Sequence, residues 1–123
     1  GSRAAIEEAR RQRKMLGGAM RQVGVLCAAA LHALEHNLGR LADDHDNARR
    51  LAEGLAQLDE VSIEVDRVHT NIVCFDVEDA HGFVERARQA GVLLNAMTST
   101  MVRAVTHLHI TREDIDRALA ALS

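Results

Sequence analysis

The sequence has no tryptophan, tyrosine or proline, and Phe75 and Phe83 are the only aromatic side chains among its 123 residues. Stacking platforms for bases or sugars need several aromatic rings. The formal net charge of −3 also differs from the positive charge of proteins that hold phosphate backbones. These two absences argue against binding to carbohydrate or single-stranded nucleic acid, and we expect no nucleic-acid partner.

Lysine and cysteine are scarce. Lys14 is the single lysine among the 15 lysines and arginines, and the two cysteines, Cys27 and Cys74, stand in apolar stretches without C-x-x-C spacing. Such cysteines are typical of reduced, structural thiols in a cytosolic protein rather than of a disulfide framework.

Long apolar runs are also absent. No run approaches the roughly 18 to 20 residues that cross a bilayer, and the amino end, with Glu7 and Glu8, lacks the layout of a signal peptide. We therefore expect a cytoplasmic protein with no membrane partner. The chain length suits one ordinary domain but is short for an enzyme that must enclose a cofactor.

Helical patterns occupy the first half of the chain. Ser2 is a candidate N-cap for a first helix that Gly17 and Gly18 end. A second helix is predicted over residues 21–35, and its side chains are apolar on nearly every side, so protein must cover it all round. A long amphipathic helix is predicted over residues 38–58 and can pack on one surface only. Its apolar face contains Leu41, Ala48, Leu51, Leu55 and Leu58.

From residue 61 the periodicity changes to two, which predicts strands over residues 61–65, 70–77, 92–96 and 101–110. The second of these alternates two sets of side chains. The sets are Ile72, Cys74 and Asp76, and Val73, Phe75 and Val77.

Two further helices are predicted, one between the second and third strands and one at the carboxyl end. Asp79 is the candidate N-cap of the former and Gly91 ends it. Thr111 and Asp114 form a T-x-x-D start for the latter. The predicted fold class is α+β: leading helices, then a small domain with a mainly antiparallel four-stranded sheet and helices on one face.

Histidines are the only candidate metal ligands with a suggestive spacing. His32 and His36 are four residues apart on a predicted helix, so both imidazoles can share one face. Two ligands do not make a site, and solvated or hydrogen-bonded histidines are the simpler interpretation. We assign no metal.

A glycine stretch between cations stands at residues 13–22, with the sequence RKMLGGAMRQ. Glycines ahead of a helix can leave backbone N–H groups open to an anion such as phosphate. The alternative is a glycine hinge between two helices with solvated charges. The stretch is not a P-loop, because it lacks the G-x-x-x-x-G-K-[ST] pattern.

Arg103 stands in an otherwise apolar predicted strand. A guanidinium in such a place needs an anionic partner and pairs bidentately with a carboxylate. The partner is either an internal Asp or Glu or the carboxylate of a substrate, and the chemistry alone leaves both open.

Four segments of the chain, in order, resemble the final third of low-specificity L-threonine aldolases, which are fold-type I enzymes that use pyridoxal 5'-phosphate. The segments are RKMLGGAMRQVGVLCAAALHALEHN, LADDHDNARRLAEGLAQL, TNIVCFDV and VRAVTHLHITREDIDRAL. The resemblance extends over essentially the whole chain, and RKMLGG-x-MRQ is its most specific part. Ala19 stands where the family usually has a third glycine, and His109 where it usually has aspartate.

The resemblance implies roles for three residues. Arg103 matches the arginine that holds the substrate carboxylate. Lys14 and Arg21 match cations that lie near the cofactor, reaching a neighbouring subunit's site in the dimer, and Arg21 is the better candidate for the phosphate. No catalytic residue is assigned, because the Schiff-base lysine, the ring-stacking side chain and the acid facing the pyridine nitrogen would all precede Gly1.

The resemblance also implies an organisation and a reaction. Residues 1–37 would be leading helices from the large-domain or interdomain region, and residues 38–123 the C-terminal small domain. The whole enzyme, a homodimer or homotetramer in amino-acid metabolism, would cleave L-threonine or L-allo-threonine to glycine and acetaldehyde. This chain alone is predicted to be inactive, because the Schiff-base lysine is absent from it and it needs the rest of the catalytic domain.

Two alternatives stay open. The chain could be the small domain of another fold-type I enzyme, an aminotransferase or a β-eliminating lyase, because these share the architecture and a carboxylate-binding arginine. Otherwise it could be a free-standing, non-enzymatic module that dimerises through the second helix.

Overall fold

The computed structural model describes residues 1–123, which form two compact units, Gly1–Leu38 and Gly39–Ser123. No helix in either unit is both long and apolar enough to pass through a membrane. The sequence predicts that residues 1–37 and residues 38–123 belong to different domains of a longer enzyme. That assignment stays a prediction.

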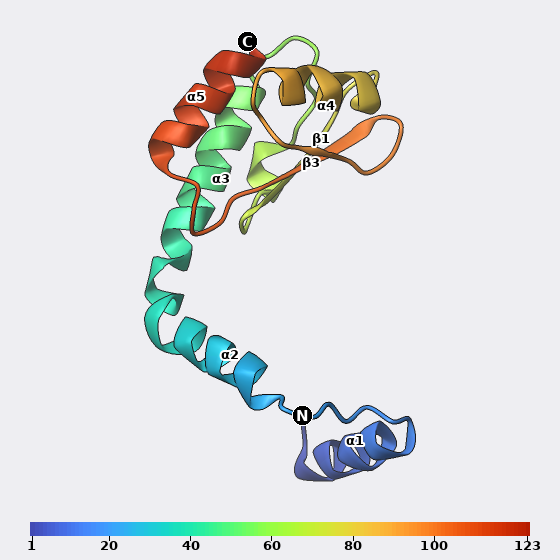
Figure 1. Cartoon of the computed structure of the whole chain (residues 1–123). Coiled ribbons are helices and arrows are strands. Elements are labelled where there is room, and N and C mark those ends of the chain that lie inside the picture. The colour runs from blue at the N-terminus through green and yellow to red at the C-terminus, as the bar shows by residue number, and fades with distance from the viewer. The chain divides into compact units, whose positions relative to one another are not determined.

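The first unit contains two helices, α1 (Arg3–Met15) and α2 (Gly24–His36) (Figure 1). The Ser2 hydroxyl accepts a hydrogen bond from the backbone N–H of Ala5, which confirms the predicted N-cap. The chain leaves α1 through Gly17, whose φ of 72° lies in the left-handed region that glycine adopts without strain.

No side chain of α2 is buried. Its residues are apolar on nearly every side, as the sequence predicts, and Val25 is 75% exposed while Leu31 and Leu34 are 57% and 58% exposed. Exposed apolar surface of this extent is typical of a helix that another protein segment covers.

The second unit alternates helices and strands (Figure 1). Its elements are the 3-10 turn η1 (Leu38–Arg40), α3 (Leu41–Leu55), the 3-10 turn η2 (Val65–Arg67), β1 (Ile72–Asp76), α4 (Ala80–Gln89), β2 (Asn95–Ala96), β3 (Met101–Val105) and α5 (Arg112–Leu122). Helix α5 runs beside α3, and Gly54 faces Leu119 at their contact, where a larger side chain would collide.

Both predicted helix starts in this unit are confirmed. The Asp79 carboxylate accepts from the N–H of Gly82 at 3.0 Å. Thr111 and Asp114 form a complete capping box, in which each side chain accepts a hydrogen bond from the other residue's backbone N–H. Local side-chain chemistry therefore sets both boundaries.

The strands form one antiparallel sheet in the order β1-β3-β2. Val73, Phe75, Val102 and Ala104 face a single buried core that also contains side chains of α3, α4 and α5, such as Leu55, Phe83 and Ile115. The alternate residues of β1 and β3 lie on the opposite face of the sheet, which the helices leave open. The predicted α+β class with helices on one face is confirmed.

The sheet has three strands, so the predicted four-stranded sheet is wrong. Residues 61–65 form only one isolated bridge, between Ser62 and Asp76, before the chain turns into η2. Val61, Ile63 and Val65 do point inward in alternation. The periodicity therefore reports alternating burial, which does not require a paired neighbouring strand.

The strand predicted over residues 101–110 ends at Val105, because hydrogen bonds of Thr106 fix the chain to Asp44 and Asn71. The buried Thr106 hydroxyl donates to the backbone oxygen of Asp44 at 2.6 Å, and the Asn71 amide donates to the backbone oxygen of Thr106 at 2.7 Å. The next residues turn, and the N–H of Ile110 donates to the backbone oxygen of His107.

Candidate functional site

Arg103 lies on the central strand, on the open face of the sheet. Its neighbours along β3, Val102 and Ala104, point into the core, so the side chain of Arg103 points the other way. It is half-buried there, and its Nε is a buried nitrogen without a hydrogen-bond partner.

Arg103 differs from the other half-buried arginines in lacking a carboxylate. Arg40 pairs with Asp44 at 2.7 Å, and Arg50 pairs with Asp116 at 2.6 Å. No ion pair joins Arg103 to any acid of the chain. The internal salt bridge that the sequence left open is therefore absent, and the guanidinium is available to an external anion.

Two residues beside Arg103 were not singled out as site residues in the sequence. The strand register pairs Arg103 with Cys74 on β1 and with Asn95 on β2. The sequence indicates only a structural thiol at Cys74 and shows no motif at Asn95. Only the register between strands, which periodicity within one strand does not supply, reveals that they flank Arg103.

Lys14 and Arg21 belong to the first unit, whereas Arg103 belongs to the second. Lys14 lies in the last turn of α1, and Arg21 lies in the turn that precedes α2. Both are exposed, and no acid of the chain forms an ion pair with either. Both cations are therefore free to bind an anion.

The glycine stretch does not offer open backbone donors at the glycines themselves. The N–H groups of Gly17, Gly18 and Ala19 donate to the carbonyl oxygens of Lys14, Arg13 and Gly17. The tight turn after α1 uses those donors. The prediction that the glycines leave their N–H groups open to an anion is therefore wrong.

Four of the seven histidines lie in two pairs, and neither pair has a third ligand. The rings of His32 and His36 are 4.4 Å apart between centroids, and those of His107 and His109 are 5.8 Å apart. No group of three or more His, Cys, Asp or Glu side chains has the arrangement of a metal site.

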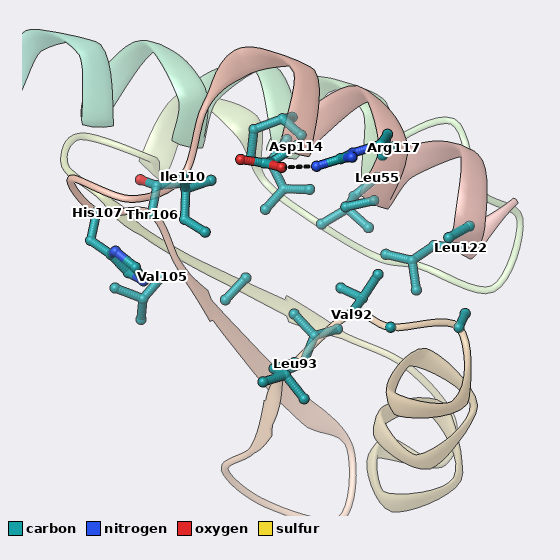
Figure 2. Close-up of a pocket in the computed structure, with 18 of the residues that line it drawn as sticks. Leu55, Val92, Leu93, Val105, Thr106, His107, Ile110, Asp114, Arg117 and Leu122 are labelled. Atoms are coloured by element: carbon teal, nitrogen blue, oxygen red, sulfur yellow. Dashed lines mark hydrogen bonds and ion pairs between the residues drawn. The ribbon is translucent and has the colours of Figure 1, made fainter.

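A pocket of about 550 Å³ lies elsewhere in the second unit, between α5 and the edge of β3 (Figure 2). Its walls include Val92–Leu94 and Ala104–Thr106, together with Asp114 and Arg117 of α5, which form an ion pair with each other. Arg103 does not line this pocket, so this cavity is not the candidate carboxylate site.

The Asp114 carboxylate is the group with the most perturbed acidity near this pocket. The backbone N–H of Thr111, the Arg117 guanidinium and the Thr111 hydroxyl lower the pKa of Asp114 from 3.8 to about 2. The causes are the capping box of α5 and the ion pair with Arg117, so the shift reflects local helix structure rather than catalysis.

A sequence model of the family described as Beta-eliminating lyase matches residues 1–80, which is more than half of the chain. The chain belongs to the Beta-eliminating lyase family. It is 43% identical over 125 residues to low-specificity L-threonine aldolase 1 of Arabidopsis thaliana and 44% identical over 122 residues to the low specificity L-threonine aldolase of Escherichia coli strain K12. Each alignment covers 98% of the chain.

The chain spans 35% of the length of each of these two relatives. A relative with a different name, the alanine racemase TOXG of Cochliobolus carbonum, is 37% identical over 109 residues, which cover 77% of the chain and 27% of that protein. The chain is thus similar to proteins that are named for different reactions.

The fold also matches a solved structure, that of MppP soaked with the product 2-ketoarginine. The TM-score is 0.58 at 16% sequence identity, and the match covers 73% of this chain and 29% of that one. At this identity the likeness supports the fold alone.

Proposed function

We propose that this chain is the C-terminal part of a pyridoxal phosphate-dependent aldolase that cleaves L-threonine or L-allo-threonine to glycine and acetaldehyde. The observation that carries the proposal is the half-buried Arg103 guanidinium, which has no carboxylate partner in the chain and a buried Nε without an acceptor. The 43% and 44% identities to threonine aldolases support the reaction.

Arg103 binds the α-carboxylate of the amino acid in this proposal. A guanidinium and a carboxylate pair through two parallel hydrogen bonds, which fix orientation as well as position. Holding the carboxylate fixes rotation about the bond to Cα, and this rotation decides which Cα substituent is aligned for cleavage. The role of Arg103 is thus binding and orientation, and it transfers no proton.

The residues of the chain fit the phosphate end of the cofactor. Lys14 and Arg21 are exposed cations without an acidic partner, and a phosphate dianion suits them. We assign the covalent attachment to a lysine outside this chain. Pyridoxal phosphate, when bound, supplies an electron sink for the carbanion that forms as the Cα–Cβ bond breaks.

The rest of the enzyme is part of the proposal. The chain spans 35% of its threonine aldolase relatives, so we infer a longer polypeptide whose remaining residues cover α2 and complete the site. We further propose that this enzyme is a cytoplasmic homodimer or homotetramer in glycine and threonine metabolism.

Product analysis of the longer polypeptide with pyridoxal phosphate tests the reaction. The proposal predicts equal amounts of acetaldehyde and glycine from L-threonine, measured by alcohol dehydrogenase coupling and amino-acid analysis. The family description favours β-elimination as the second candidate. Ammonia and a 2-oxo acid from a β-substituted amino acid, without acetaldehyde from threonine, would replace the aldolase with that reaction.

A further inference from the structure

Arg103 is the middle member of a row of three side chains that crosses all three strands. The register places Cys74 opposite it on β1 and Asn95 opposite it on β2. Directly opposed residues of an antiparallel pair have Cβ atoms about 4.5 to 5.5 Å apart. Both neighbours are exposed, so the row lies on the open face of the sheet.

The row carries one cationic side chain and no carboxylate. The nearest acid along β1 is Asp76, which lies opposite Met101 and forms no ion pair with Arg103. A residue diagonal to Arg103 is about 7 to 8 Å away between Cα atoms. Because neither direct neighbour is an acid, nothing in the row competes with an external carboxylate for the guanidinium.

Asn95 carries an uncharged amide, which can supply the hydrogen-bond acceptor that the Nε–H of Arg103 lacks. No hydrogen bond engages the Asn95 side chain, while the Nε of Arg103 is buried and lacks an acceptor. An amide has a carbonyl oxygen that accepts and an NH₂ group that donates, without net charge. It can accept from Nε–H and donate to a carboxylate that lies on the Nη groups.

We propose that Asn95 is a positioning residue for Arg103, and that its uncharged amide reserves the guanidinium for the carboxylate of the substrate. The proposal rests on the carboxylate-binding role of Arg103. It predicts that a carboxylate at position 95 would form an internal ion pair with Arg103. This ion pair would then compete with the substrate carboxylate for the guanidinium.

The first test asks whether the side chain at position 95 lies next to the Arg103 guanidinium, and it does not depend on enzymatic activity. In Asn95→Asp, the introduced carboxyl, followed by NMR in the chain, should titrate at least about one pH unit lower than a carboxyl introduced by Ser99→Asp, because a guanidinium favours the charged form. Ser99 is an exposed residue between β2 and β3 and serves as the matched control. Adding Arg103→Gln should abolish the difference. Equal titration of the two carboxyls would overturn the proposal.

The second test uses the complete enzyme with its cofactor. Asn95→Asp should raise the KM for L-threonine and the dissociation constant of glycine roughly tenfold or more, because like charges now face each other, while kcat changes much less. Asn95→Ala should raise both less, and Ser99→Asp should change neither.

The outcomes separate this inference from the proposed function. Unchanged glycine binding in Asn95→Asp, with strong loss in Arg103→Gln, would overturn the role of Asn95 and leave that of Arg103 intact. A wild-type enzyme that does not cleave threonine contradicts the aldolase, and glycine binding then decides the role of Asn95 by itself.

Discussion

At the scale of single residues, the candidate site is identified by an arginine that is half-buried but has no ion pair. Arg40 and Arg50 are half-buried like Arg103, and each has an acid within ion-pair distance. The sequence alone places Arg103 in a strand and shows that it needs an anion. It does not show that the chain supplies none, because that depends on which acids the fold brings near.

Arg21→Ala should weaken retention of pyridoxal phosphate by the complete enzyme. A charge-assisted contact to phosphate is worth about 1.5 to 3 kcal/mol, so we expect the dissociation constant to rise at least about tenfold, measured by cofactor absorbance during dialysis. Arg10→Ala is the matched control, because Arg10 is an exposed arginine without an ion pair. Equal cofactor affinity in both variants would contradict the assignment of Arg21.

Asp114 should make stability depend on pH below about 4. Its pKa is lowered in the fold from 3.8 to about 2 by Thr111 and Arg117. The stabilisation is therefore fully present above pH 4 and is lost as the pH falls through 2. The urea midpoint of the wild type should exceed that of Asp114→Asn at pH 5, and the gap should close towards pH 2. A gap that does not vary with pH would disprove this account.

At the scale of elements, the sequence predicts caps and faces better than strand pairing. The N-caps Ser2, Asp79 and Thr111 are confirmed because each depends on a side chain and a backbone N–H a few residues away. Pairing depends on distant segments. Residues 92–96 alternate in burial as predicted, yet only Asn95 and Ala96 bond to β3.

Because β2 contains only Asn95 and Ala96, the edge of β3 next to Val105 has no paired strand. This unpaired edge is called the seam. Continuing the register of Asn95 with Arg103 would set Leu93 opposite Val105, but the chain separates there, and both line the pocket of Figure 2. Successive strand residues direct their backbone groups to opposite edges. Thr106 donates to Asn71 on the β1 side, so the backbone groups of Val105 face the seam without a partner.

Amide hydrogen exchange should therefore differ sharply between two adjacent residues. The N–H of Thr106 is bonded to the backbone oxygen of Asn71 at 2.9 Å and should exchange slowly. The N–H of Val105 should exchange at least about tenfold faster, since it needs no strand opening to reach water. Equal protection of both amides in NMR exchange experiments would mean that β2 continues along β3 through residue 93.

At the scale of the whole molecule, α2 is the strongest indication that this chain works within a larger protein. Its residues are apolar on nearly every side and none of them is buried, and the chain spans 35% of the threonine aldolases that it resembles. The sequence predicts the apolar character of α2. It does not predict what covers α2, because covering residues need not be close in the sequence.

The native polypeptide should be roughly three times the size of this chain, as one catalytic domain plus this region requires. Peptides from the Arg103 region, detected by mass spectrometry after gel separation of a lysate from the source cells, would identify the band. A native species of 13.5 kDa would favour the free-standing module that dimerises through α2.

The most direct test of the central claim is the kcat/KM of Arg103→Ala in the complete enzyme with L-threonine. Loss of the charge-assisted carboxylate contact should cost at least about 2 to 3 kcal/mol in transition-state stabilisation, or roughly 30-fold to 150-fold in kcat/KM. Arg112→Ala, at an exposed arginine without an ion pair, should keep wild-type kinetics. A near-normal kcat/KM for Arg103→Ala would contradict the carboxylate-binding role on which the proposed function rests.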